Sequence, residues 1–319
     1  MKRFATLLLA APVAWALQVR QLYQFPDASQ FLENIALLQS GNLILSTFDH
    51  ARVYAMDPND EDPIPDILVQ VPDSTATTGI AEVADNVFAI SAGNLNRSTS
   101  SFESGSAKIA LITLPGGCYG AAASVKVVAQ LPDAGLLNGM AVLPKHRDVV
   151  LSVDSKTGQV FRIDTKTGQV DIAFQDEHLT PGANPPPTAI GVNGAKIFHG
   201  YLYVTNSQTM AVGRFKIDEY GNKSGEFELV ASLALSNPDA VPDDFAVAKD
   251  GTLYVALPPT SLAKVTPDGQ PSVFVNGSSA GAFLYSPSSA AFSFDEKTLF
   301  ITTSGTGSGK GGQILAIDM

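Results

Sequence analysis

Six polar residues recur at equivalent positions of a repeated sequence pattern, and they are the first candidates for chemistry. Each stands at the start of a short strand of small and apolar residues, and the six are Glu33, Thr78, Asn138, Asn193, Asp243 and Ser288. Two are carboxylates and two are carboxamides, so the set is rich in oxygen ligands. Such a set suits Ca²⁺ or Mg²⁺ better than zinc. Alternatively, the same side chains cap strand ends or solvate a channel.

A repeat of four short strands must position these residues. In each copy a second apolar strand follows the first, beginning at Leu43, Val87, Val149, Leu202, Leu253 and Leu299. A third strand follows in every copy and a fourth in five copies, with turn residues between them. Six copies of an ordered quartet of strands are typical of β-propellers. We therefore predict an all-β fold, a six-bladed β-propeller.

The two ends of the chain indicate how the ring closes. The last copy stops at Met319 after its third strand, whereas an additional apolar strand, residues 18–25, precedes the first copy. We expect this N-terminal strand to be the outer strand of the last blade, since closure removes an open sheet edge. The single cysteine, Cys118, cannot form an internal disulfide and is expected in a loop.

The first residues have the features of a secretory signal peptide. Lys2 and Arg3 precede an apolar run over 4–13, and Ala14-Trp15-Ala16 is an A-x-A cleavage site. We predict a signal peptide over 1–16 and a single propeller domain over 17–319. Glycosylation sequons at Asn96, Asn222 and Asn276 agree with this route. The expected location is the secretory pathway, either secreted or in a vesicular or endomembrane compartment.

Composition limits the partners. The chain has 20 Lys+Arg against 31 Asp+Glu, a formal net charge of −11. This balance disfavours nucleic acid and anionic membrane surfaces, which attract basic faces. No nucleophile-elbow, P-loop or zinc-protease motif is present in the sequence. We expect a small organic partner.

Loops at the same end of the propeller carry the remaining candidates. His50 follows the second strand of the first copy and could act as a base or a hydrogen-bond donor. The other candidate substrate-binding residues are Phe48, Phe102, Asn206, Met210, Phe283 and Tyr285. A mostly apolar pocket with a few convergent polar groups is typical of sites for organic ligands. For each aromatic residue, packing in the core is the alternative.

Two segments resemble a known family. Pro242-DDFAVAKDGTLYVA and Val192-NGAKIFHGYLYVTNS are similar to the repeats of the gluconolactonase-like, or senescence-marker-like, six-bladed propellers. The resemblance implies one divalent cation, Ca²⁺ or another, held by Glu33, Asn193 and Asp243, with Asn138 matching a further channel asparagine. Those enzymes favour glycine after the glutamate and after the aspartate, whereas this chain has Asn34 and Asp244.

The opening LENIA at 32–36 and the NGAKIFHGYLYVTNS repeat at 193–207 look closer to a fungal secretory branch. That branch includes hetero-Diels-Alderases, which join a reactive quinone methide of tropolone type to a terpene alkene such as humulene in meroterpenoid biosynthesis. The resemblance implies a fungal source, an apolar organic substrate and no required cofactor. Asn138, Asn193 and His50 would then donate hydrogen bonds.

Three functions follow from these observations. We favour a pericyclase of the hetero-Diels-Alderase kind. The second is a metal-dependent lactonase or esterase, in which the cation polarises the ester carbonyl and Asp243 or Asp244 is the base. The third is a propeller that binds a ligand without catalysis.

Overall fold

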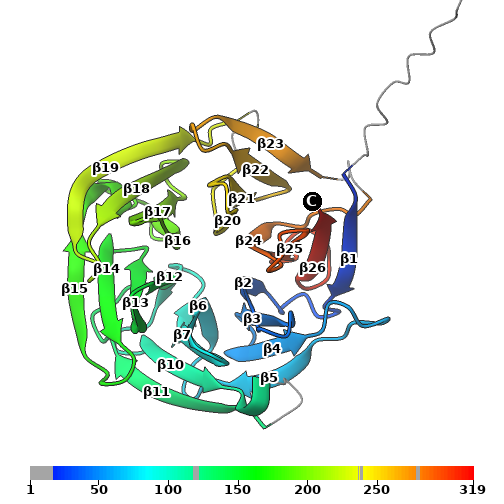
Figure 1. The fold of residues 1–319 in the computed structure, drawn as a ribbon, viewed down its shortest axis with the longest axis horizontal. Coiled ribbons are helices and arrows are strands. Elements are labelled where there is room, and N and C mark those ends of the chain that lie inside the picture. The colour runs from blue at the N-terminus through cyan, green and yellow to red at the C-terminus, as the bar shows by residue number, and fades with distance from the viewer. Residues whose placement is uncertain (1–16, 118–121, 236, 238–239, 278–280) are drawn as a thin grey trace, which may run out of the picture.

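The structure is a computed structural model, and it describes residues 17–117, 122–235, 237, 240–277 and 281–319. Within these residues, six antiparallel sheets of four strands stand around a central axis as blades (Figure 1). The predicted six-bladed propeller is confirmed. The helical content of the described residues is two short 3-10 turns, Pro115–Gly117 and Glu177–Leu179, and none of their helices is long and apolar enough to span a membrane.

The blades follow the predicted order of strands from the axis outward. The innermost strands are β2 (Leu32–Leu37), β6 (Ala76–Ala84), β12 (Leu137–Leu143), β16 (Val192–Phe198), β20 (Phe245–Val247) and β24 (Pro287–Phe292). The second strands are β3 (Leu43–Thr47), β7 (Val87–Gly93), β13 (His146–Asp154), β17 (Tyr201–Asn206), β21 (Leu253–Leu257) and β25 (Thr298–Thr303).

The third strands are β4 (Arg52–Met56), β10 (Lys108–Thr113), β14 (Gln159–Asp164), β18 (Ala211–Ile217), β22 (Ser261–Val265) and β26 (Gln313–Asp318). The outer strands are β5 (Asp66–Gln70), β11 (Ser124–Gln130), β15 (Val170–Gln175), β19 (Lys223–Ser232), β23 (Pro271–Asn276) and β1 (Val19–Gln24). A short hairpin that the sequence did not reveal, β8 (Leu95–Asn96) and β9 (Ser101–Phe102), projects between β7 and β10.

Burial explains the sequence pattern of each layer. Every residue of β3 and of β21 is buried, because a second strand is covered by neighbouring blades on both faces, and its sequence is a continuous apolar run. The outer strand β19 alternates between covered and exposed residues. Apolar clusters fill each space between neighbouring blades, so the core is a ring of interfaces.

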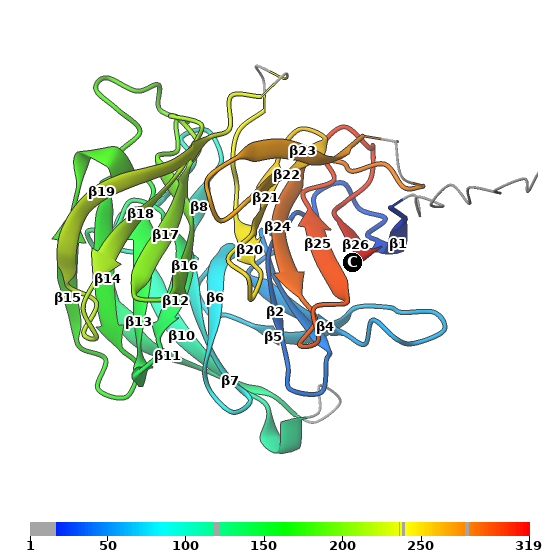
Figure 2. The ribbon, with the colours of Figure 1, turned by 45° about the horizontal axis from the view of Figure 1, so that its top comes forward.

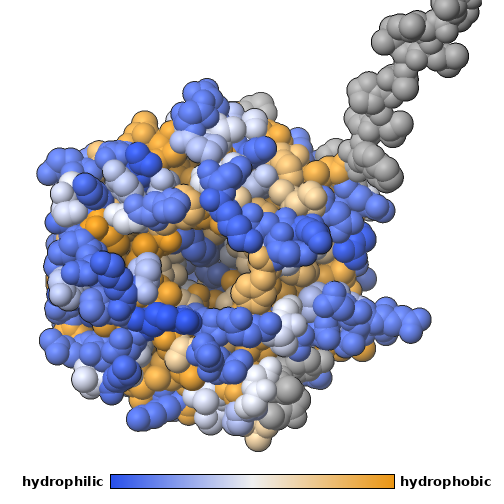
Figure 3. Space-filling model, in the orientation of Figure 1, coloured by the Kyte–Doolittle hydropathy of each residue, from blue (hydrophilic) through white to orange (hydrophobic). Residues whose placement is uncertain are grey.

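The N-terminal strand closes the ring, as predicted. β1 pairs antiparallel with β26 from Val19 opposite Ile317 to Gln24 opposite Gln313, which completes the sheet β1-β26-β25-β24 (Figure 1). Just beyond β1, the ring of Phe25 packs edge-on against Tyr54 of the first blade, at 5.0 Å between centroids. The last and first blades are thereby joined. Figure 3 shows one face of the ring, hollowed at its centre and bordered there by both apolar and polar surface.

Several expectations fall partly outside the described residues. Residues 1–16 and Cys118 lie there, so the signal peptide and the setting of the thiol stay predictions. Asn96, Asn222 and Asn276 are exposed, although the last residue of the third sequon, Ser278, is not described. The location and the glycosylation of the protein also stay predictions.

We expect Phe25→Ala to destabilise the whole ring. Phe25 is 3% exposed, and removing a buried phenylalanine side chain costs about 3–5 kcal/mol of unfolding free energy. Phe294→Ala is the control, because Phe294 is 53% exposed and surface changes usually cost less than about 0.5 kcal/mol. Urea unfolding of both variants measures the difference. Equal midpoints for the two variants would contradict the closure described here.

Candidate functional site

A cavity of about 270 Å³ lies at the end of the ring where the innermost strands begin. Five of the six predicted polar residues line it: Glu33, Thr78, Asn138, Asn193 and Asp243. The apolar part of the lining is Phe31, Phe48, Leu95, Leu136 and Ile190, and Arg97 and Ser100 complete it. The inner strands converge on the axis in Figure 2, which explains how residues far apart in sequence share one small volume.

Hydrogen bonds fix the two carboxamides. The side-chain nitrogen of Asn138 donates to Ser155 Oγ at 3.2 Å, and that of Asn193 donates to Ser207 Oγ at 3.1 Å. Each serine hydroxyl in turn donates to a backbone carbonyl ahead of the next inner strand or at its start. Asn193 Oδ1 is buried and has no hydrogen-bond partner among the described residues. Buried acceptors are normally paired, so an oxygen without a partner indicates a place where a ligand or a cation binds.

Glu33 and Asp243 form no ion pair with any basic residue in the described part of the chain. Burial raises the pKa of the Glu33 carboxyl well above its usual range, and repulsion from Asp243 and Asp244 raises it further. Burial and repulsion from Asp244 likewise raise the pKa of Asp243, whereas contact with the Asn193 side chain lowers it. The cavity therefore has two carboxyl groups that favour a proton, a cation or a hydrogen-bond donor over a free negative charge.

Asp244 is buried and does not line the cavity. Its carboxylate accepts hydrogen bonds from Lys196 Nζ at 2.6 and 2.8 Å, from Asn34 Nδ2 at 2.8 Å and from Ser289 Oγ at 3.2 Å. These donors occupy the carboxylate, so the structure does not support Asp244 as a catalytic base. The two departures from the family pattern, Asn34 and Asp244, are thus bonded to each other. Gly194 follows Asn193 in blade four just as Asn34 follows Glu33 in blade one. A Cβ on Gly194 would lie 2.4 Å from Asp244 Oδ1, so a side chain at this position would collide with the carboxylate.

The three residues that the family resemblance assigned to a divalent cation are chemically suited to hold such a cation. Within the described residues, Glu33 and Asp243 supply carboxyl oxygens without basic partners, and Asn193 supplies an amide oxygen without a hydrogen-bond partner. Hard divalent cations prefer oxygen ligands of this kind, and a bound cation would favour the ionised carboxylates. The described residues contain no group of three His, Cys, Asp or Glu, so the carboxamide is needed to complete a set of three.

Several predicted residues do not line the cavity. Ser288 is buried, and its hydroxyl donates to Leu32 O at 2.8 Å. Phe102 is 4% exposed and packs against Gly93, so it anchors the β8–β9 hairpin from below. Met210 lies in a left-handed turn at φ 52°, and its carbonyl accepts from Leu233 N. These residues hold elements in place.

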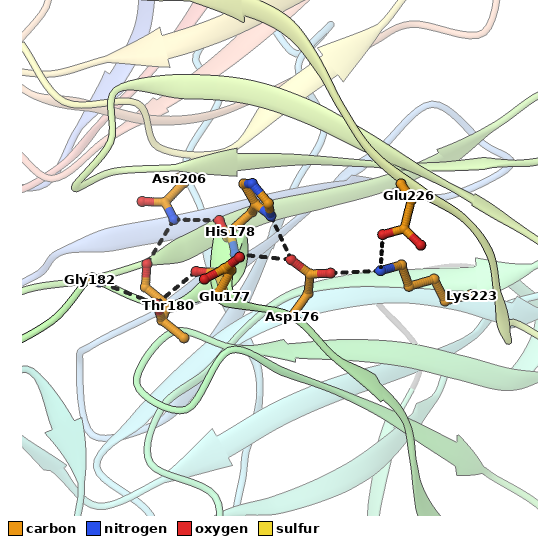
Figure 4. Close-up of polar contacts among 8 residues, drawn as sticks. All are labelled: Asp176, Glu177, His178, Thr180, Gly182, Asn206, Lys223 and Glu226. Carbon is orange, nitrogen blue, oxygen red and sulfur yellow. Dashed lines mark hydrogen bonds and ion pairs between the residues drawn. The ribbon is translucent and has the colours of Figure 1, made fainter.

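His50 and Asn206 do not line the cavity either. His50 is exposed in a left-handed turn at φ 50°, and its backbone carbonyl accepts a hydrogen bond from Gln70 Nε2. Asn206 Nδ2 donates to the carbonyls of His178 and Thr180 at 2.9 and 3.0 Å, which clamps the β15–β16 connection (Figure 4). Neither side chain is positioned for the predicted role.

Phe283 and Tyr285 pack on each other near blade six, at 4.5 Å between ring centroids, and do not line the cavity. Phe48, in contrast, is where the sequence placed it. Its ring stacks on Phe31 at 4.5 Å and 15°, and the guanidinium of Arg97 lies 5.9 Å from its centroid.

Phe31, Leu95, Arg97, Ser100, Leu136 and Ile190 line the cavity although the sequence did not single them out as site residues. Phe31 and Leu136 stand two residues before Glu33 and Asn138, each one residue ahead of its inner strand. Their equal spacing from the two polar residues was a usable signal. Leu95, Arg97 and Ser100 belong to a hairpin with two residues in each strand, which is too short to show any period.

No family model matches the chain. The chain is 27% identical over 197 residues to asR5 of Sarocladium schorii, named as a proposed hetero-Diels-Alderase, with 54% of this chain and 49% of the relative covered. It is 28% identical over 222 residues to a Phoma sp protein with the same proposed activity in its name, with 63% and 62% covered. The chain thus spans less than two thirds of either relative.

Solved structures share the architecture. A luciferin-regenerating enzyme has a TM-score of 0.67 at 14% identity, with 95% of both chains covered. A calcium-binding regucalcin of Agrobacterium tumefaciens has a TM-score of 0.66 at 12% identity, again with 95% of both chains covered. A gluconolactonase of Xanthomonas campestris has a TM-score of 0.61 at 16% identity, with 95% of this chain and 89% of the other covered. These similarities in structure show a shared β-propeller fold.

The raised pKa values predict a pH dependence of stability. Because Glu33 and Asp243 hold protons more tightly when folded, their stabilising contribution is complete below about pH 4 and is lost as the pH rises through the folded pKa values. The double variant Glu33→Gln with Asp243→Asn does not titrate there. The free energy of unfolding of the double variant minus that of wild type should therefore increase from pH 4 to 8. Urea unfolding in the presence of chelator measures this difference. If the difference in unfolding free energy between the double variant and wild type stays constant or shrinks as the pH rises, the two carboxyl groups do not hold protons more tightly in the folded protein, and the prediction is wrong.

Proposed function

We propose that the chain is a pericyclase of the hetero-Diels-Alderase kind, which joins a quinone methide of tropolone type to a terpene alkene such as humulene. The observation that carries this proposal is the cavity itself, with an apolar wall above a floor of convergent polar groups. The similarity to two relatives named for this activity supports it.

The reaction needs no nucleophile and loses no atoms. One carbon–carbon and one carbon–oxygen bond form between the heterodiene and the alkene while π bonds are consumed. Catalysis of this kind depends on holding both partners in register, and positioning alone can supply about 7–11 kcal/mol. Excluding water from the cavity also protects a quinone methide from addition of water.

The lining divides into parts that match the two partners. The stacked rings of Phe31 and Phe48 offer a flat surface for the conjugated quinone methide. Leu95, Leu136 and Ile190 offer apolar contact to a hydrocarbon. At the floor, Asn138, Asn193 and the protonated forms of the two carboxyls are donors for an oxygen on which charge develops.

A divalent-metal-dependent lactonase or esterase is the second candidate. The unpaired Asn193 Oδ1 beside Glu33 and Asp243 favours it. A cation held by these three residues would polarise an ester carbonyl or activate water. The other residues of the cavity would then orient the ester, with Asp243 rather than Asp244 left as a base.

We predict that Phe48→Ala lowers kcat/KM for cycloaddition about tenfold to a hundredfold, because the loss of one wall misplaces the partners. The assay generates the quinone methide in the presence of humulene and separates the cycloadduct from the water adduct. Phe283→Ala is the control, because Phe283 is aromatic and partly exposed but does not line the cavity. An equal loss in both variants would contradict the assignment of the site.

Metal dependence separates the two candidate functions. We predict that chelator leaves cycloaddition within about twofold of the untreated rate, and that Glu33→Gln with Asp243→Asn retains it within about fivefold, because carboxamides replace the donors. Loss of activity in chelator and its recovery with Ca²⁺, together with hydrolysis of a lactone, would instead establish the second candidate. Calorimetry with Ca²⁺ on wild type and the double variant measures cation binding directly.

A further inference from the structure

We propose that Lys156 is a positioning residue that ties two separate walls of the cavity together and thereby sets the selectivity of the reaction. The statement about the walls rests on geometry alone, whereas the statement about selectivity rests on the proposed function. Lys156 lies in the turn between β13 and β14 and is not itself part of the cavity lining.

The ammonium group of Lys156 is bonded to three backbone carbonyls. Its Nζ donates to Thr99 O at 2.9 Å, to Pro187 O at 3.0 Å and to Ala189 O at 2.6 Å. A lysine ammonium has three donors, and all three are used. Thr99 lies at the tip of the β8–β9 hairpin, whereas Pro187 and Ala189 lie in the connection between β15 and β16.

These two segments carry much of the cavity wall. The hairpin contributes Leu95, Arg97 and Ser100, and Ile190 follows directly after the bonded Ala189. The segments are far apart in sequence and belong to different blades. A single side chain therefore bridges the two walls.

Hydrogen bonds and packing also fix the backbone and the aliphatic stem of Lys156. Asp154 is fully buried, and its carboxylate accepts from the backbone N–H groups of Gly135, Leu136, Lys156 and Thr157. A Cβ on Gly135 would lie 2.7 Å from Lys156 Cβ, so the aliphatic stem packs directly on the backbone. Burial lowers the pKa of Lys156, and within the described residues carbonyl oxygens rather than a carboxylate bond its ammonium.

The neighbouring blade shows what the same turn does without a lysine. There the equivalent segment is Asn206-Ser207-Gln208-Thr209, which matches Asp154-Ser155-Lys156-Thr157. Ser207 holds Asn193 just as Ser155 holds Asn138. Gln208, however, is exposed, and its side chain makes no hydrogen bond within the described part of the chain. The turn forms in both blades, so the tether is a separate feature that lysine adds.

Hydrogen exchange of Lys156→Met tests the tether without substrate. The variant keeps the length of the stem and removes the three donors, and Gln208→Met makes the same change in the matched turn. We expect amides in 96–101, and the hydrogen-bonded amides of Ala189 and Gly191, to exchange at least about tenfold faster in Lys156→Met, with β12 and β17 unchanged, because only local opening becomes easier. Gln208→Met should resemble wild type. No change in the exchange rates, or a change in only one of the two segments, would overturn the proposed tether.

The isomer ratio of the cycloadduct, after subtraction of the product of the uncatalysed reaction, tests selectivity, because the ratio formed by the enzyme does not depend on how much of the protein is folded. We expect Lys156→Met to lower kcat at least about tenfold with KM within about threefold, and to shift the isomer ratio toward that of the uncatalysed reaction. Faster exchange with an unchanged isomer ratio would overturn the selectivity statement. If wild type does not accelerate cycloaddition, the proposed function fails, and the exchange rates still decide on the tether.

Discussion

The rest of this site depends on two buried carboxyl groups, at the mouth of a closed ring, that have no basic partner among the described residues. Glu33 and Asp243 are held at the starts of two inner strands, with no basic residue bonded to either among the described residues. Their neighbour Asp244 has Lys196, Asn34 and Ser289 as partners. Because an uncompensated buried charge is costly, the protein neutralises one acid and leaves two that a proton, a cation or a ligand must satisfy. This contrast between adjacent residues distinguishes the end of the channel that holds the candidate site.

The ring makes such an arrangement sustainable. Apolar clusters fill every interface between blades, and β1 closes the circle on β26, so the inner strands cannot move apart to relieve repulsion. The cavity then has two parts of different character. Strand starts fix its polar floor, whereas loops and a small hairpin form its apolar wall, and Lys156 joins two of those loops. Relatives of one fold can therefore share a floor and differ in chemistry through their walls.

The sequence predicted the fold and the floor because both follow from local periodicity. Continuous apolar runs such as residues 253–257 reveal second strands, and the spacing of the copies aligned Glu33 with Asn193 and Asp243. The walls were harder to predict. Phe102 looked like a lining residue but packs against Gly93, and a left-handed turn leaves His50 exposed and outside the lining. Loop conformations here depend on contacts between distant segments, such as Lys156 with Thr99 O, and carbonyl oxygens leave no mark in a sequence.

A crystal structure with the cycloadduct of a tropolone-type quinone methide and humulene would test the central claim most directly. We predict that the adduct lies in the cavity, with its rings against Phe48 and Ile190. One of its oxygens should be within hydrogen-bonding distance of Glu33, Asn193 or Asp243. An adduct bound elsewhere on the ring, or excluded by a divalent cation on those three residues, would contradict it.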